Sequence, residues 1–369
     1  MKQISSLEIN GLKSYTEKTE IKLSQLNVFS GVNSVGKSTA IQSISLIKSL
    51  YDSYINNNKI ISEAFLNNEM FGLELGTYEK IITGNNNNFE IGINNKLIQI
   101  EAKEGDALKV QANMKEVTEE IKVNLFHGHF YYLAAERFGP RNYQVIDSYG
   151  IDNCGIKGEN AFHILNKYSE NIIADDLLFQ GTANKAEKTL KKQTEKWLNT
   201  FFDGVEFSST LENALRLVKL EVKQSNQDMG YVSLSNVGFG LSYVLPILLT
   251  CLTSKEDSLI IIENPEAHLH PKGQSLLGQF LAQVSSSKRQ VVVETHSEHI
   301  INGMRLFCLK NSISPNELTI NFFSIKSSKT NVKKISLNER MELLEWPDDF
   351  FDQQENDLRH MREIRRKNG

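Results

Sequence analysis

Residues 31–38, with the sequence GVNSVGKS, constrain the chain most, because they have the spacing of a Walker A phosphate-binding loop. An apolar run at 26–29 precedes the loop, and a helix-like stretch from Thr39 to Leu50 follows it. Glycines in such a loop let successive backbone N–H groups face a phosphate, and the helix that follows adds its positive N-terminal end. The sequence therefore predicts a P-loop that binds a nucleoside triphosphate.

The residues of this loop have separate predicted roles. Lys37 is expected to reach the β- and γ-phosphates of ATP, and the Ser38 hydroxyl to bind Mg²⁺. The predicted cofactor-binding residues of the loop are Asn33, Ser34, Val35, Gly36, Lys37, Ser38 and Thr39. A plain glycine turn is the alternative. We favour the P-loop because its strand and helix context is right and a second acidic strand follows far downstream.

Length and composition indicate a cytoplasmic protein. The chain has 369 residues, of which 40% are apolar, which is enough for the cores of about two domains. The longest apolar run, 241–252, is too short to span a bilayer, and the N-terminus has no apolar signal region. Cys154, Cys251 and Cys308 are widely spaced, which fits a reducing compartment better than structural disulfides. We therefore expect no membrane partner.

The charge pattern gives little sign of nucleic-acid binding. The net charge is −4, so any DNA contact has to come from a local basic patch. One such patch is the tail, with Arg359, Arg362, Arg365, Arg366 and Lys367. We interpret this patch first as a solvated helical end and keep DNA binding as the alternative.

Hydrophobic periodicity predicts an α/β chain with inserted elements. Short strands at 4–9 and 19–23 are expected to form a hairpin, and alternation from about 70 to 133 predicts an antiparallel sheet with a turn at 85–88. The pattern becomes helical from about 158 to 220. From about 315 a β-rich and then acidic extension follows.

These patterns predict five segments along the chain. They are an N-terminal lobe with the Walker A loop (1–55), an antiparallel β subdomain (56–133), a helical insertion (134–230), a lobe with the remaining site residues (231–312) and a C-terminal extension (313–369).

Two late apolar strands carry further candidate site residues. Strand 259–263 ends in Glu263, which is expected to lie beside the P-loop strand and to hold Mg²⁺ directly or through water. Strand 290–294 is followed by Thr295 and His296, and the imidazole of His296 could hydrogen-bond the γ-phosphate. The alternatives are an acid that merely ends a strand and a histidine with an ordinary polar partner.

The order of these motifs resembles a known group of ATPases. Residues 9–15 (INGLKSY) ahead of the P-loop resemble the opening of SMC-like and RecF-like ABC ATPases. Residues 263–271 (ENPEAHLHP) and 293–299 (VETHSEH) resemble the OLD-type branch (overcoming lysogenization defect). Segments 236–246 and 345–353 are similar to a subgroup with an uncharacterised C-terminal extension. The resemblance implies a P-loop NTPase of the ABC/SMC-head type, with a mixed sheet, an antiparallel β subdomain and a helical insertion.

The resemblance also implies a two-chain active site. In this family ATP is sandwiched between two heads, so that the P-loop of one chain faces the signature segment of the other. Gly238 and Gly240 stand at the signature position, where backbone N–H groups before a helix would approach the γ-phosphate. Glycine replaces the usual signature serine at 238. The alternative is that both glycines simply allow tight packing.

A second departure concerns catalysis. The usual catalytic glutamate after the Mg²⁺ carboxylate is Asn264 here, and an amide can orient water but cannot accept its proton. Glu266 is the predicted substitute, with assistance from His296. Slow hydrolysis is favoured over a clamp that only binds ATP. His268 and His270 lack the additional ligands of a zinc site, so no zinc is predicted.

Four functions compete for this sequence. The leading one is an ATPase whose ATP-dependent homodimer regulates a separately encoded effector, such as a nuclease, in bacterial antiphage defence or a toxin–antitoxin-like module. The alternatives are a DNA-associated SMC- or RecF-like repair ATPase, a self-contained nuclease and a transporter subunit. The stretch after His296 is about half as long as a Toprim nuclease domain requires. The acidic group at 348–357 is therefore interpreted as a solvated face.

Overall fold

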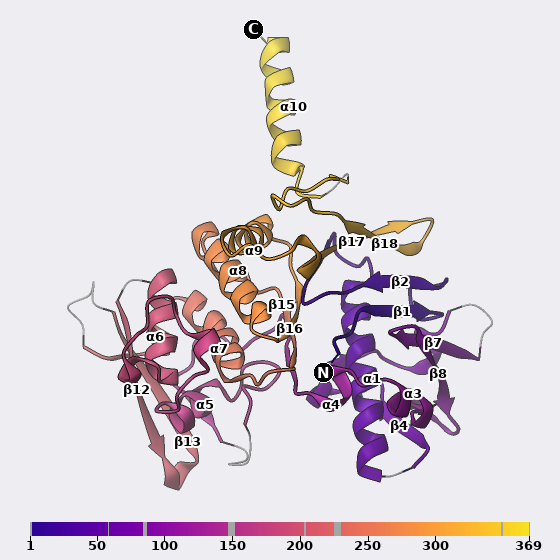
Figure 1. Cartoon of the computed structure of the whole chain (residues 1–369), viewed down its shortest axis with the longest axis horizontal. Helices are drawn as coiled ribbons and strands as arrows, with labels where there is room; N and C mark the ends of the chain where they lie inside the picture. The colour runs from indigo at the N-terminus through magenta and orange to yellow at the C-terminus, as the bar shows by residue number, and fades with distance from the viewer. Residues whose placement is uncertain are drawn as a thin grey trace.

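The structure is a computed structural model, and it describes residues 2–57, 59–83, 87–146, 152–202, 204–224, 230–347 and 350–368. Figure 1 shows two lobes on either side of a central layer, with helix α10 (Gln353–Asn368) projecting from the body. Part of the predicted turn at 85–88, together with Asp348 and Asp349, lies outside the described residues.

The central layer is a six-stranded sheet. Its strands, in order across the sheet, are β10 (Phe130–Leu133), β15 (Leu259–Glu263), β16 (Gln290–Glu294), β3 (Leu26–Gly31), β17 (Leu318–Lys326) and β18 (Lys329–Ile335). The first five strands are parallel, and β18 pairs with β17 in the antiparallel sense. The carboxyl ends of β3, β15 and β16 therefore meet at one edge, where ligands bind in sheets of this type.

One expectation about this sheet was wrong. The strand that ends in Glu263 does not lie beside the P-loop strand, because β16 pairs with both β15 and β3 and separates them. Both late strands are continuous apolar runs that end in glutamate, and all their residues are buried. Their pattern therefore shows that both lie inside the sheet but does not fix their order.

A second, antiparallel sheet covers one side of the central layer. Its order is β2 (Thr19–Lys22), β1 (Ser6–Asn10), β7 (Asn88–Ile93), β8 (Lys96–Lys103), β9 (Asp106–Asn113) and β4 (Ile61–Phe65). The predicted hairpin is present, since Leu7 is paired with Ile21 in antiparallel register. Helix α1 (Lys37–Asn57) contributes to one apolar core with residues from both sheets. The smaller elements of this lobe are β5 (Asn67–Asn68), β6 (Leu73–Glu74), α2 (Tyr78–Ile81), α3 (Lys115–Glu120) and α4 (Asn124–His127).

The opposite lobe is only partly helical, contrary to the periodicity-based expectation for 158–220. It contains α5 (Ala161–Tyr168) and α6 (Leu190–Phe201), but also a sheet of β11 (Tyr143–Val145), β13 (Leu217–Gln224), β12 (Val205–Glu212) and β14 (Val232–Ser233). In β13, the alternating residues Val218, Leu220 and Val222 are all fully buried. This two-residue period is typical of a half-buried strand, but helical patterns flank it on the N-terminal side, and the whole range was therefore predicted to be helical.

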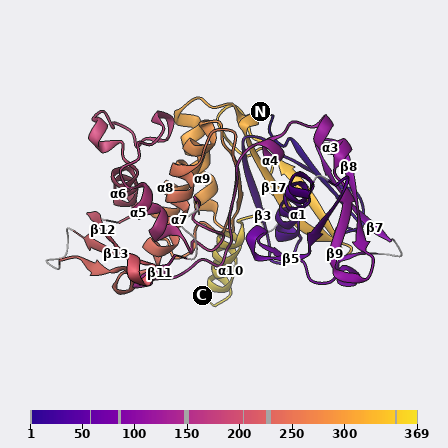
Figure 2. The ribbon, with the colours of Figure 1, turned by 90° about the horizontal axis from the view of Figure 1, so that it is seen from below.

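Three helices connect this lobe to the central layer. They are α7 (Phe239–Thr253), α8 (Pro271–Ser286) and α9 (Glu298–Lys310), which Figure 2 shows between β12–β13 and the central strands. Their buried faces share an apolar core with central-sheet residues such as Val291 and Ile262. Within the described part of the chain, no helix is both long and apolar enough to cross a membrane.

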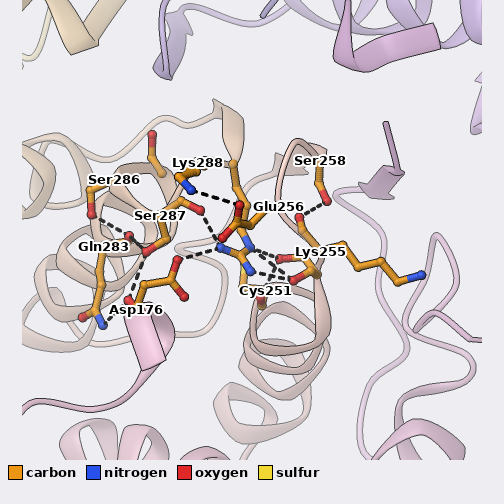
Figure 3. A network of polar contacts seen from close by, with 12 residues as sticks. Asp176, Cys251, Lys255, Glu256, Ser258, Gln283, Ser286, Ser287 and Lys288 are labelled. Carbon is orange, nitrogen blue, oxygen red and sulfur yellow. Dashed lines mark hydrogen bonds and ion pairs between the residues drawn. The ribbon is translucent and has the colours of Figure 1, made fainter. Parts of the chain in front are cut away.

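A polar network fixes the amino end of β16. Gln283 and Ser287 both donate hydrogen bonds to the carbonyl oxygen of Asp176, over 3.4 and 3.0 Å (Figure 3). The buried guanidinium of Arg289 donates to the carbonyl oxygen of Ser254 over 2.9 Å. Because buried polar groups are costly unless they are hydrogen-bonded, these contacts stabilise one position of β16 and thereby of Glu294 at its other end.

Candidate nucleotide and metal site

Gly36 and its supports hold the P-loop in shape. Gly36 has φ of +102°, and a Cβ at this position would lie 2.6 Å from the Thr330 hydroxyl oxygen, so a larger residue would be strained. The Tyr15 hydroxyl donates to the Gly36 carbonyl over 2.8 Å, and the Thr330 hydroxyl donates to the Val35 carbonyl over 3.0 Å. The loop is therefore supported by the N-terminal motif and by β18, two segments far apart in sequence.

A cavity of about 470 Å³ lies at the P-loop. It brings together most of the predicted site residues, namely Asn33, Ser34, Gly36, Lys37, Ser38, Thr39, Glu263, Asn264 and His296. It is also lined by Lys13, Ser14, Ala135 and Glu294, which were not predicted as site residues. The other predicted residues do not line the cavity: Val35 is buried within the loop, and the rest are Glu266, Gly238 and Gly240. A second cavity, of about 680 Å³, is lined by residues 252–256, which connect α7 to β15, and by none of the predicted site residues.

Lys37 is folded back onto its own loop. Its Nζ donates to the carbonyl oxygens of Gly31 and Val32 over 3.0 and 2.7 Å, and the side chain is almost fully buried. Burial lowers the pKa of Lys37, while the carboxylate of Glu294, 3.7 Å away, opposes that shift. A phosphate in the cavity would give this ammonium group a charged partner in place of neutral carbonyls.

Glu263 is held on both carboxylate oxygens. The Tyr132 hydroxyl donates to Oε1 over 2.8 Å, and the backbone N–H of Ala135 donates to Oε2 over 3.0 Å. Burial raises the pKa of Glu263, although both hydrogen bonds oppose this effect. The carboxylate is therefore oriented at the cavity wall by residues of β10 and of the loop that follows it.

Glu294, at the end of β16, is a site residue that the sequence reasoning missed. Its Oε2 accepts a hydrogen bond of 3.4 Å from the Ser38 hydroxyl. Burial and the nearby charge of Glu263 raise the pKa of Glu294 to about 7. A signal was present in the sequence, because both late strands end in glutamate and parallel neighbours bring their last residues to the same edge of a sheet.

Asn264 occupies a strained turn directly after Glu263. Its φ is +43°, a left-handed conformation that asparagine tolerates better than most residues with a side chain. Arg137, also missed from the sequence, donates to the carbonyl oxygens of Glu263 and Asn264 over 2.7 Å each. The Asn264 Oδ1 atom is buried and has no hydrogen-bond partner within the described chain. A buried acceptor of this kind at a cavity wall fits a bound ligand or water that donates to it.

Glu266 points to the turn that carries His296. The Thr295 hydroxyl donates to its Oε2 over 2.8 Å, and the backbone N–H of His296 donates to its Oε1 over 2.7 Å. The imidazole of His296 lines the cavity, and burial, followed by the charge of Lys37, lowers its pKa. Neutral imidazole is therefore favoured at this position.

The two signature glycines differ in their surroundings. Gly238 is the residue before α7, and a Cβ there would meet no atom within 4 Å. At Gly240 a Cβ would lie 2.8 Å from the carbonyl oxygen of His268, so this glycine permits close packing of α7. The ring of His268 packs against Tyr243 of α7 with centroids 4.6 Å apart. The packing alternative therefore applies to Gly240, whereas Gly238 is open to a partner.

The residues that line the cavity fit Mg²⁺ and a nucleoside triphosphate. Ser38, Glu263 and Glu294 supply hydroxyl and carboxylate oxygens, the hard ligands that Mg²⁺ prefers. Residues 33–39 form the loop and the first turn of α1, whose backbone N–H groups can donate hydrogen bonds to phosphates.

Known proteins share this fold. The structure of the Smc head domain with an extended coiled coil, bound to the C-terminal domain of ScpA, from Pyrococcus furiosus, is 14% identical, with a TM-score of 0.53 over 99% of this chain and 100% of that one. A crystal structure of the SmcHead bound to the C-winged helix domain of ScpA is 14% identical, with a TM-score of 0.52 over 92% of this chain and 99% of that one. No curated protein matches the sequence. Identities this low establish the fold alone.

Two segments match known families. Residues 156–301 match the family described as AAA ATPase domain, and residues 313–361 match a protein family of unknown function (DUF3696). The fold is thus one that SMC head domains share, and within it residues 156–301 match an AAA ATPase domain. More particularly, the chain combines this SMC-head-like fold, a segment that matches an AAA ATPase domain and a C-terminal segment that matches the second family. The predicted fold class and the predicted extension are thereby confirmed.

Proposed function

We propose that the chain binds ATP with Mg²⁺ in the P-loop cavity and hydrolyses it slowly. The observation that supports this most is the single cavity in which Lys37, Ser38, Glu263, Asn264 and His296 meet. Lys37 and the loop N–H groups bind the phosphates, and Ser38 and Glu263 hold the metal ion. His296 interacts with the γ-phosphate from the neighbouring strand.

Hydrolysis is slow because the cavity lacks a general base at the usual place. Asn264 can position a water molecule through its free Oδ1 but cannot take its proton at neutral pH. Glu266, the predicted substitute, uses both carboxylate oxygens to hold Thr295 and His296. These bonds favour a positioning role for Glu266, in which it sets the place of the His296 ring. A catalytic role for Glu266 stays a prediction.

Dimerisation through ATP is the second part of the proposal. Gly238 is unobstructed and the neighbouring Phe239 side chain is 55% exposed, so the start of α7 is accessible to a second copy. In the dimer, Gly238 of one chain would meet the ATP held by the P-loop of the other. We propose that this dimer, in the cytoplasm, regulates a separately encoded effector, such as a nuclease, in antiphage defence or a toxin–antitoxin-like module.

A role on DNA is the second candidate. The observation that favours it is the exposure of α10, which carries Arg362, Arg365 and Arg366 on a helix that projects from the body (Figure 1). Binding through these arginines must weaken as salt increases, because phosphate contacts release counterions. Binding of duplex DNA that is absent or insensitive to salt would remove this candidate.

Light scattering with and without ATP and Mg²⁺ tests the dimer. Wild type should shift from monomer to dimer, whereas Lys37→Ala and Gly238→Trp should remain monomeric. Gly238→Trp should keep its affinity for ATP, because the added side chain enters open space. A Gly238→Trp variant that still dimerises with ATP would contradict the role of this segment.

Turnover measurements separate the roles of Glu266. If Glu266 only positions His296, Glu266→Gln should retain most of the turnover, because an amide oxygen can still accept one hydrogen bond. A loss of turnover comparable to that of Lys37→Ala would instead identify Glu266 as the base.

A further inference from the structure

Glu294 lies where three parts of the site meet. It ends β16, the strand between the P-loop strand and the strand that ends in Glu263. In the parallel register, Glu294 is paired with Glu263 on one side and with Phe29, two residues before the P-loop, on the other. Two carboxylates therefore leave adjacent strands at the same edge of the sheet, where Ser38 also lies.

The contacts of Glu294 differ from those of Glu263. Glu263 accepts two hydrogen bonds of ordinary length, from Tyr132 and Ala135. Glu294 has a long contact of 3.4 Å with the Ser38 hydroxyl and a separation of 3.7 Å from Lys37 Nζ. Both distances exceed the usual range for a charge-assisted hydrogen bond, so strong coordination capacity remains on this carboxylate.

The electrostatics favour a cation at this position. Glu294 is only 7% exposed, and Glu263 is 9% exposed beside it. Among the positive side chains near the cavity, which include Lys13, Lys37 lies 3.7 Å from Glu294, and its Nζ is directed at the carbonyl oxygens of Gly31 and Val32. Two buried like charges are costly, and a divalent ion between them would offset both.

We propose that Glu294 is a second carboxylate ligand of the Mg²⁺ site, acting with Glu263 and the Ser38 hydroxyl, directly or through metal-bound water. This inference rests on the proposed binding of ATP with Mg²⁺ at the P-loop, and it adds a ligand that the resemblance did not supply. One consequence is that the chain binds a divalent cation even without nucleotide, because two carboxylates and a hydroxyl are already in place.

A structural role for Glu294 predicts something different. If the carboxylate served only as an ion-pair partner of Lys37, Glu294→Gln would remove this partner from the ammonium group and change the affinity for ATP. The affinity for the metal ion alone would then stay the same. Metal affinity without nucleotide therefore separates the two roles.

Electron paramagnetic resonance of Mn²⁺, titrated into the full chain without nucleotide, provides the readout. The variants are Glu294→Gln and Glu263→Gln, with Glu256→Gln as a control that removes one exposed carboxylate just before β15, at the other end of the strand from Glu263. We expect both site variants to weaken Mn²⁺ binding at least tenfold and Glu256→Gln to match wild type. Circular dichroism of each variant confirms that it is folded.

The outcomes distinguish this inference from the function on which it rests. Unchanged Mn²⁺ affinity in Glu294→Gln, or no Mn²⁺ binding by wild type without nucleotide, would overturn the inference. In the latter case, the same titration with ATP present shows whether the P-loop still binds a metal nucleotide. Failure of wild type to bind ATP with Mn²⁺ would instead remove the proposed function.

Discussion

Gly36 shows how one residue determines the shape of the P-loop. Gly36→Ala should destabilise the protein by about 1–3 kcal/mol and abolish ATP binding, because the residue combines a φ of +102° with a Cβ position 2.6 Å from Thr330 Oγ1. Gly76→Ala is a matched control, since Gly76 has φ of +96° and open space around it. Chemical denaturation and ATP titration compare the two. Equal effects would show that backbone strain, rather than the contact with Thr330, determines the outcome.

Glu294 makes stability depend on pH in a predictable direction. Its pKa is about 7 in the folded chain, above the value of 4.5 for an ordinary glutamate, so the folded state binds this proton more tightly. The contribution to the unfolding free energy is fully present below pH ~4.5 and is lost as pH rises through ~7, up to about 3 kcal/mol. With a chelator and no nucleotide, wild type should lose more stability than Glu294→Gln between pH 5 and pH 8. Parallel losses in both proteins would contradict the shift.

At the residue scale, the sequence predicted the residues that line the cavity better than it predicted their supports. The loop residues and Glu263 follow from spacing, because phosphate binding requires a fixed local geometry. Arg137 and Glu266 act through contacts with turns distant in sequence, such as the Arg137 bond to the Asn264 carbonyl. No local pattern contains such contacts, so the role of Arg137 required the three-dimensional structure.

At the scale of elements, the segment between β18 and α10 packs onto the central sheet partly through one aromatic side chain. Phe350 is 1% exposed and packs against Phe322 of β17 and against Trp346, with ring centroids 5.5 and 5.4 Å apart. Phe350→Ala should lower the unfolding free energy by about 3–5 kcal/mol. Deleting α10 from Gln353 onward should change it by less than about 0.5 kcal/mol, because the helix projects from the body (Figure 1). Urea denaturation checks both, and a large effect of the deletion would contradict the account.

The elements themselves were predictable where their periodicity was clear. The first hairpin and the strand–loop–helix at residues 26–50 follow from local pattern, and both are present. The order of β15 and β16 was not predictable, because both are uniform apolar runs. Strands β12 and β13 were not predicted, because their short two-residue alternation follows a longer stretch with helical periodicity and was assigned to the same helical segment.

At the scale of the whole molecule, segments from both ends of the chain build one site. Strands β17 and β18, in the predicted C-terminal segment, join the sheet of the P-loop, and β18 contributes Thr330 to the support of Gly36. The start of α7, which is proposed to contact ATP in trans, belongs to the other side of the central layer (Figure 2). ATP in a dimer would therefore connect both lobes across two chains.

The central claim is that this cavity binds ATP with Mg²⁺, and isothermal titration of ATP into the full chain tests it most directly. We predict saturable binding by wild type in the presence of Mg²⁺ and a loss of at least tenfold in affinity for Lys37→Ala, since this variant lacks the ammonium group that meets the phosphates. Equal binding by both proteins, or no binding by wild type, would contradict the account.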